Sequence, residues 1–193
     1  MWQALALRAG SVACESDEAL VAAARERSDA FGELYERYLP GVYRYLRART
    51  ASGDEAADLT QLVFLRVLRA LPRYRAGRVP FASWLFRIAR NAATDAHRRR
   101  KPAVSWDYVP ELSTPDDHDG PEALALRQER LTHLRALLAR LDPSKRELLA
   151  FRFAAGLSAR EIAPIVGKSE AAVKKQLTRI IATLKEYYRD ELS

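Results

Sequence analysis

The chain has 193 residues, of which 48% are hydrophobic and 30% charged, a balance that excludes a collagen-like or broadly disordered protein. Its formal charge of +7 favours a polyanionic partner, and its longest uncharged stretch, residues 79–86, is far shorter than the roughly 18 to 20 apolar residues of a membrane-spanning helix. A single cysteine, Cys14, can form no internal disulfide, and the histidines lack metal-ligand spacing, so we expect a cytoplasmic protein with neither a metal site nor a cofactor.

The first half of the chain is expected to be helical, after a leader over residues 1–16. Apolar residues recur there at helical spacing. The three series are Phe31, Leu34, Tyr35, Tyr38, Val42 and Leu46; Leu59, Val63 and Val67; and Leu85, Ile88, Ala92 and Ala96. They predict an all-α domain over residues 17–101.

Local signals refine these helices. Pro40 predicts a kink or a break near Leu39, because proline has no N–H to donate. Ser52 and Glu55 have the spacing of a capping box, at the start of a helix that Pro72 ends.

Two segments read as loops. Residues 72–80, PRYRAGRVP, have a proline at each end and a glycine between, so they predict a loop with an exposed Tyr74. Residues 102–121 hold four prolines and five acidic side chains but no basic one, so they predict a linker. The linker separates two basic blocks, residues 1–101 with 18 basic and 11 acidic side chains, and residues 122–193 with 14 and 9.

The block over residues 122–193 predicts a second small helical domain. Its first helix is outlined by Leu124, Leu131, Leu134, Leu138 and Leu141. Asp142 and Pro143 suit the N-cap and first residue of the next helix, which Gly156 can end.

Residues 157–186 then fit a helix-turn-helix. Ser158 and Glu161 form a second capping box, Gly167 lies in a short turn, and Ser169 can cap the long second helix. A plain helical hairpin is the alternative. Pro164 predicts a kink in the helix before the turn, with the carbonyl of Arg160 left unpaired.

These motifs together resemble a known family. The segments DLTQLVFLRVLRALPRYR (58–75) and FASWLFRIARNAATDAHRRRK (81–101), followed by an acidic linker and a C-terminal helix-turn-helix, are similar to extracytoplasmic-function sigma factors of bacterial RNA polymerase. The resemblance implies two helical domains, the second and fourth sigma regions. It also implies a function: binding core polymerase, recognising the −10 and −35 promoter elements and promoting DNA opening.

The resemblance places a polymerase-binding surface on the helix that begins near residue 53. An amphipathic helix can offer polar groups for hydrogen bonds and an apolar anchor to the clamp of the largest polymerase subunit. An ordinary core helix with a solvated edge is the alternative. The residues it implicates are Asp58, Leu59, Gln61, Leu62, Val63 and Phe64.

For the −10 element the resemblance implicates the 72–80 loop and the helix after it. Tyr74 can stack on a base of the melted strand while Arg73, Arg75 and Arg78 contact phosphate. Trp84 belongs either to the core or to the lining of that strand, and Asn91 bonds either a base edge or the local backbone. A further basic set is assigned to duplex phosphate, with solvated surface as the alternative. It comprises Arg87, Arg90, Arg98, Arg99, Arg100 and Lys101.

The helix-turn-helix would read the −35 element with the outward side chains at the start of its second helix. Lys174, Lys175 and Arg179 are the first choices, and Gln176 is a weaker one because it can face partly inward. Lys175 and Gln176 also depart from the family's common pattern, which changes the promoter sequence expected. The remaining outward positions are Glu170, Ala171 and Thr178.

Catalysis by this chain is not expected. The glycines that lie closest, Gly32 and Gly41, are too far apart for a dinucleotide or phosphate-binding loop, and no serine lies in a nucleophile-elbow pattern. The competing function is a stand-alone helix-turn-helix regulator, which leaves the block over residues 72–101 without a role. The resemblance also implies that an anti-sigma factor can be a partner.

Overall fold

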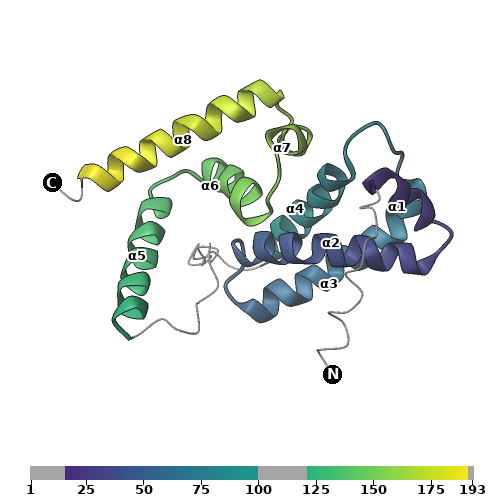
Figure 1. The fold of residues 1–193 in the computed structure, drawn as a ribbon, viewed down its shortest axis with the longest axis horizontal. Coiled ribbons are helices and arrows are strands. Elements are labelled where there is room, and N and C mark those ends of the chain that lie inside the picture. Colours follow the sequence, from purple (N-terminus) through teal and green to yellow (C-terminus); the bar gives the residue numbers. More distant parts are fainter. Residues whose placement is uncertain (1–15, 100–120, 191–193) are drawn as a thin grey trace.

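The computed structural model describes residues 16–99 and 121–190, and these residues form helices and connecting turns without a strand (Figure 1). The predicted leader except Ser16, most of the predicted linker and the pair Arg100 and Lys101 lie outside the described residues. The elements are α1 (Asp17–Ala23), α2 (Ser28–Arg47), α3 (Gly53–Ala70), the 3₁₀ turn η2 (Leu71–Arg73), α4 (Phe81–Arg99), α5 (Pro121–Ala139), α6 (Pro143–Leu149), the π-helical turn η3 (Ala150–Ala154), α7 (Ala159–Val166) and α8 (Glu170–Asp190). The all-α prediction is therefore confirmed.

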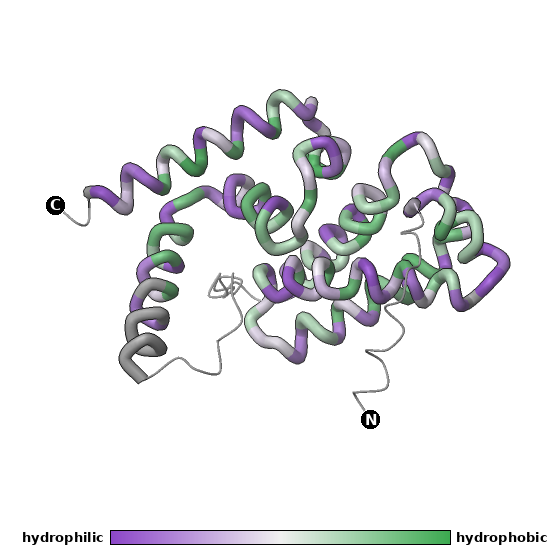
Figure 2. Tube along the Cα trace, viewed as in Figure 1, coloured by the Kyte–Doolittle hydropathy of each residue, from purple (hydrophilic) through white to green (hydrophobic). Residues whose placement is uncertain are grey.

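Helices α1–α4 make up the N-terminal domain. Each of α2, α3 and α4 buries one apolar face against the others, which is why polar and apolar residues alternate along them in Figure 2. Val42, Val63 and Leu85 are fully buried at the centre of this packing. Helix α1 was not anticipated, because seven residues are too few to show a helical period; Ser16, which caps it by accepting from the Ala19 N–H, was the available signal.

Pro40 does not break α2, which runs from Ser28 to Arg47 without interruption. The proline removes the N–H that would bond the Glu36 carbonyl, but both residues lie on the exposed side of the helix, where water can replace that bond. Ser52 caps α3 as predicted, accepting from the Glu55 N–H. The Glu55 carboxylate accepts from the N–H of Ala51 rather than from the cap residue.

Helices α5–α8 make up the C-terminal domain, and its local signals are confirmed. Ser158 and Glu161 form a complete capping box at α7, and Ser169 accepts from the Ala172 N–H at the start of α8. Gly167 ends α7 with a φ of 69°, a left-handed conformation that a residue with a Cβ adopts at a cost. Helix α7 continues through Pro164 to Val166.

The two domains share one core. The Tyr45 ring of α2 stacks on Phe151 of η3, with centroids 4.7 Å apart and planes 9° apart. Phe86 of α4 packs edge-on against the Phe151 ring, with centroids 6.5 Å apart. All three aromatic side chains are fully buried, so η3 packs against α2 and α4.

Within residues 16–99 and 121–190, no helix is both long enough and apolar enough to cross a bilayer. The same residues contain no group of three or more His, Cys, Asp or Glu side chains placed to hold a metal ion.

The Asp142 cap yields a stability prediction. Its carboxylate accepts from the Ser144 hydroxyl and from the N–H of Lys145, and these bonds, with the Lys145 ammonium, hold its pKa well below the usual value. A folded pKa below the unfolded one stabilises the protein above the unfolded pKa, and this contribution is lost as the pH falls through about 4 and lower. We expect Asp142→Ala to lower the free energy of unfolding by about 1 kcal/mol at pH 7.

Chemical denaturation of both proteins at pH 7 and at pH 3 would check this. The difference between them should shrink at the lower pH. Glu129→Gln is the control, because Glu129 is an exposed carboxylate on α5 and caps no helix in the structure. An equal difference at both pH values would contradict the assignment of the cap to the charged carboxylate.

Candidate nucleic-acid and polymerase interface

Helix α3 presents an apolar face that the fold does not cover. Leu65 is 52% exposed and Leu68 is 47% exposed, although both belong to a helix whose opposite face is in the core. A shallow groove beside them is lined by Phe31 and Tyr35 of α2 and by Gln61, Phe64, Leu65 and Leu68 of α3. Exposed apolar side chains gathered around a groove are typical of a protein-binding surface.

The residues predicted to bind polymerase divide between this surface and the core. Asp58 and Gln61 are exposed and Leu62 is half-buried. The other three predicted residues are buried, with exposed fractions of 8% for Leu59, 0% for Val63 and 5% for Phe64. They pack in the core beneath α3, and of these three only Phe64 also lines the groove.

Leu65 and Leu68 were missed by the sequence analysis. The available signal was the near-continuous apolar run over residues 62–68, which is wider than the single stripe that a surface helix needs to face its own core.

The 72–80 loop differs from the expectation in one respect. Tyr74 was predicted to be exposed, and this is wrong: its side chain is 5% exposed. Its hydroxyl donates to the Val79 carbonyl at 2.8 Å, and the Arg25 guanidinium donates to its carbonyl. Its ring packs on Phe81 and Trp84. Tyr74 therefore closes the loop on itself and is not presented to solvent for stacking on a base.

The arginines of this loop, in contrast, reach the surface. Arg73, Arg75 and Arg78 are exposed. Trp84 is half-buried, with its ring centroid 4.8 Å from that of Tyr74, so it belongs to the aromatic cluster and is still partly exposed. Asn91 is exposed.

Further along α4 the basic residues fall into two groups. Arg98 and Arg99 are exposed in its last turn. Arg87 and Arg90 face the C-terminal domain: Arg87 donates to the Pro164 carbonyl at 2.8 Å, and Arg90 contacts the Glu147 carboxylate at 2.7 Å. The Glu147 carboxylate accepts hydrogen bonds from the Arg90 guanidinium and thereby raises the pKa of Arg90. Arg87 and Arg90, two of the residues predicted to contact phosphate, are thus already bonded to other groups of this chain.

Helix α8 presents a polar, basic face over its first turns. Lys174, Lys175, Thr178 and Arg179 are exposed, as is Ala171, while Val173, Leu177 and Ile180 face the core. This arrangement of a buried stripe and a basic outer face suits a helix that enters a DNA groove.

Two contacts order the start of that helix. The Lys174 ammonium lies 2.6 Å from the carboxylate of Glu170, whose pKa it lowers. The Gln176 side chain, which is half-buried as expected, accepts from the Lys168 ammonium at 2.7 Å. Both contacts are on the surface, so DNA can replace them at small cost.

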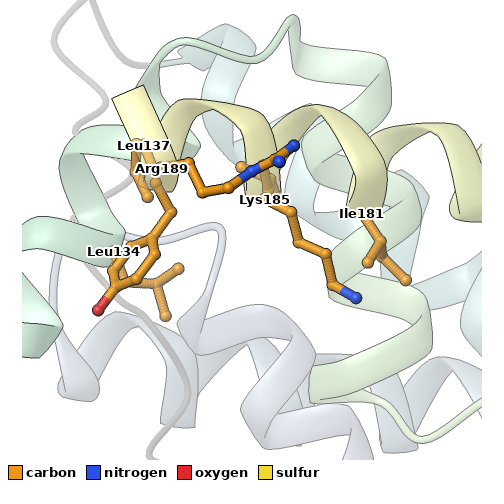
Figure 3. Close-up of a pocket in the computed structure, with 7 residues that line it drawn as sticks. Leu134, Leu137, Ile181, Lys185 and Arg189 are labelled. Atoms are coloured by element: carbon orange, nitrogen blue, oxygen red, sulfur yellow. The ribbon is translucent and has the colours of Figure 1, made fainter. Parts of the chain in front are cut away.

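A second uncovered groove lies between α5 and α8 (Figure 3). Leu134, Leu137 and Ile181 form its apolar wall, and the long side chains of Lys185 and Arg189 extend along its edge from α8. Tyr188, which is 49% exposed, completes the lining beside His133.

A helix-turn-helix with a basic outer face, linked to a helical domain with its own basic loop, defines a DNA-binding transcription protein. Comparison with known proteins narrows this class. Residues 34–102 match the family described as sigma-70 region 2, and residues 131–184 match sigma-70 region 4.

Relatives that match over most of the chain belong to the same family. The ECF RNA polymerase sigma factor SigD of Mycobacterium tuberculosis is 38% identical over 82% of this chain and 76% of its own length. BldN of Streptomyces coelicolor, also an ECF RNA polymerase sigma factor, is 33% identical over 93% of this chain and 70% of its own length. The chain belongs to the extracytoplasmic-function (ECF) sigma factors of the sigma-70 family, and it acts in promoter recognition by RNA polymerase.

Solved structures support the same fold. CnrH, solved in complex with the cytosolic domain of CnrY, superimposes with a TM-score of 0.66 at 27% identity, over 91% of this chain and 99% of that chain. The sigma factor RpoE of Bartonella quintana, solved with the anti-sigma factor NepR, shares the fold at a TM-score of 0.59 and 20% identity, over 82% of this chain and 96% of that chain.

Proposed function

We propose that three separate surfaces of this sigma factor carry its activity: the apolar face of α3 binds core polymerase, the 72–80 loop and α4 bind the −10 element, and α8 reads the −35 element. The observation that carries the proposal is the pair of basic surfaces on different domains, one on each side of residues 100–120. A stand-alone regulator would need only the surface on α8.

The α3 surface has the composition of a binding hot spot. Leu65 and Leu68 supply apolar area, while Asp58 and Gln61 lie exposed beside them and can form hydrogen bonds at the rim. Truncating these leucines would leave the domain core intact, because neither is buried in it. A role in binding polymerase accounts for apolar side chains that the free chain leaves in water.

At the −10 element we assign the exposed loop arginines to backbone phosphate, since phosphate contacts position a protein on DNA without requiring one base sequence. The buried Tyr74 holds the loop closed beneath them. The partly exposed Trp84 and the exposed Asn91 lie on the first turns of α4 and can contact an unpaired base. Arg98 and Arg99 extend the basic surface toward duplex DNA.

At the −35 element we assign base reading to the first turns of α8. Lys175 and Arg179 lie one turn apart on the exposed face, and both can donate to guanine or to phosphate in the major groove. Lys174 can contact DNA only after its ion pair with Glu170 breaks.

Reconstituted transcription tests the function. The purified chain is added to core polymerase that cannot initiate by itself, together with a genomic promoter library, and run-off products are mapped. Promoter-specific run-off is the expected result. Binding to double-stranded DNA without run-off would favour the stand-alone regulator, and neither result would indicate a protein of another kind.

We also propose that the chain has no catalytic activity of its own and works in the cytoplasm with polymerase. An anti-sigma factor is a further proposed partner, since RpoE was solved with the anti-sigma factor NepR and CnrH with the cytosolic domain of CnrY. The groove between α5 and α8, apolar with Lys185 and Arg189 at its edge, would suit an acidic amphipathic helix.

The assignment of α8 yields a quantitative prediction. In the double variant Lys175→Ala and Arg179→Ala, we expect the affinity of holoenzyme for a promoter carrying the −35 element to fall at least tenfold, because each good base contact is worth about 1 to 3 kcal/mol. Filter binding on the mapped promoter would measure this. The variant Lys185→Ala, which removes an exposed cation further along α8, should bind normally. Equal losses in both variants would contradict base reading by the first turns.

A further inference from the structure

A buried hydroxyl closes the base of the arginine-bearing turn between η2 and α4. Residues 75–78 are all exposed, and we call them the loop tip. Gly77 has a φ of 87° within this tip, a left-handed conformation that glycine adopts without strain. The Tyr74 hydroxyl donates to the Val79 carbonyl at 2.8 Å, so it joins the residues that flank the tip. Burial raises the pKa of Tyr74, so the hydroxyl keeps its proton and remains a donor.

The Tyr74 ring is fixed by other aromatic rings of the N-terminal domain. Its centroid lies 5.7 Å from that of Phe81 and 4.8 Å from that of Trp84. Phe81 packs edge-on in turn against Tyr38 of α2 at 5.4 Å. The N–H of Tyr74 also donates to the Leu71 carbonyl at 3.1 Å. The ring therefore cannot leave its place without disturbing the packing of α2 and α4.

Helix α1 supplies a second contact to the base of the loop. Arg25, in the turn that follows α1, donates from its guanidinium to the Tyr74 carbonyl, 49 residues away in sequence. Helix α1 is itself well anchored, because Leu20 and Val21 are each 1% exposed and Asp17 accepts from an arginine of α2 at 2.7 Å. It packs on α2 and α4 (Figure 1). A charged donor on a firm support is a strong hydrogen-bond partner for a loop carbonyl.

The two hydrogen bonds lie where they can order the tip without competing with DNA. Both involve atoms of Tyr74 and Val79, outside the loop tip, so they can persist when the tip is bound. The tip itself contains glycine and is fully exposed, so without these bonds it would have many conformations. A binding segment that holds its bound conformation only part of the time loses affinity by that fraction.

We propose that Arg25 and Tyr74 are positioning residues for the −10 element: together they hold the loop tip in the conformation that contacts the melted strand, and neither touches DNA. This rests on the proposed function, which assigns Arg75 and Arg78 of the tip to −10 phosphate. Helix α1 thereby acts in promoter recognition through Arg25, although it contributes no DNA contact of its own.

Two variants of different chemistry remove one hydrogen bond each. Tyr74→Phe removes the hydroxyl and keeps the ring, and Arg25→Met removes the guanidinium and keeps a long side chain. Arg25→Lys retains a charged donor and is the conservative variant. The matched controls are Tyr43→Phe, on a tyrosine that is 36% exposed, and Arg27→Met, whose ion pair with Asp29 lies on the surface. Circular dichroism first establishes that all five variants remain helical.

Amide hydrogen exchange of residues 74–80 is measured on the free chains, so this readout does not depend on DNA. Removing one hydrogen bond shifts a local opening equilibrium by about three- to tenfold. Exchange in this segment should therefore be faster by that factor in Tyr74→Phe and in Arg25→Met. It should match the wild type in Arg25→Lys and in both controls.

Holoenzyme made with each chain is then titrated with a single strand carrying the −10 element of the promoter mapped by run-off. We expect about three- to tenfold weaker binding for Tyr74→Phe and Arg25→Met, since the closed loop is less populated. The logarithmic salt slope should stay unchanged, because the bound tip makes the same phosphate contacts, whereas loss of one contact would change it by about 0.7. Affinities for core polymerase and for a duplex with only the −35 element should stay at the wild-type values, which a general folding defect would lower.

Unchanged hydrogen exchange in both test variants would overturn the proposal, because the two bonds would then not order the loop. Faster exchange with unchanged strand affinity would overturn it as well. A salt slope less negative by about 0.7 in Arg25→Met would show that Arg25 itself contacts phosphate, which also contradicts a positioning role. In each of these cases run-off by the wild type leaves the proposed function standing. Wild-type holoenzyme that gives no run-off would overturn the proposed function and the −10 role with it, whatever the exchange rates show.

Discussion

The double variant Leu65→Asp and Leu68→Asp should bind core polymerase on the order of 100 to 1,000 times more weakly than the wild type, and should lose run-off transcription. Central apolar anchors of an interface are each worth about 2 kcal/mol or more, and 1.4 kcal/mol is a tenfold change in affinity. Both side chains are about half exposed, so the substitution adds charge to the surface of α3 without opening a cavity in the core. The effect should therefore appear in binding and not in folding.

Binding to immobilised core polymerase measures this loss, with a thermal melt of the free chain beside it. The matched control is Ala136→Asp with Ala182→Asp, which adds the same two carboxylates to exposed helical positions of the C-terminal domain. The control should bind core normally. If the α3 variant bound core as tightly as the wild type, the apolar face would not be the polymerase contact.

Phe151→Ala should produce the largest loss of stability. The ring is fully buried between Tyr45 and Phe86, so its removal leaves a cavity at the joint between the two domains. Such a truncation costs about 3 to 5 kcal/mol, which for a chain of this size lowers the melting temperature by roughly 6 to 20 °C. Differential scanning calorimetry would measure it.

Phe153→Ala is the control for this prediction, because Phe153 lies two residues away and is 48% exposed. It should change the free energy of unfolding by less than about 1 kcal/mol. If both variants lost the same free energy of unfolding, the stack of Phe151 on Tyr45 would not contribute more to stability than an exposed phenylalanine. Two separate transitions in the wild type would show that the shared core does not couple the domains.

Local chemistry was readable from the sequence. The caps at Ser52, Asp142 and Ser158 were predicted correctly, because a cap depends on a side chain and an N–H only a few residues away. Gly167 was placed in its turn for the same reason. Helical spacing and the linker predicted two helical domains, and the motifs over residues 58–75 and 81–101, with the helix-turn-helix, gave the resemblance to sigma factors that the family matches confirm.

Surface exposure was less predictable. Tyr74 lies in a loop rich in arginine and proline, yet neighbouring aromatic rings bury it. Leu65 and Leu68 lie on a helix whose spacing alone does not say which apolar side chains the core can accept. The exposure of a side chain depends on how many neighbouring side chains the packed helices place around it. The helical spacing of apolar residues in the sequence does not give that number.

Apart from α1 and its cap, the sequence by itself determined the helices, the caps at Ser52, Asp142 and Ser158, and the basic face of α8, since each follows from residues within a few turns of one another. Only the tertiary structure decided the contacts between domains. Glu147 lies 98 residues from Arg49 and 57 from Arg90 along the chain, and Gly41 is also far from Ala155 in sequence, so their contacts depend on how α6 and η3 dock against α2 and α4. That docking makes Arg90, which the sequence analysis assigned to DNA phosphate, a partner of a buried carboxylate, because a charge left without a partner at a buried interface would be too costly.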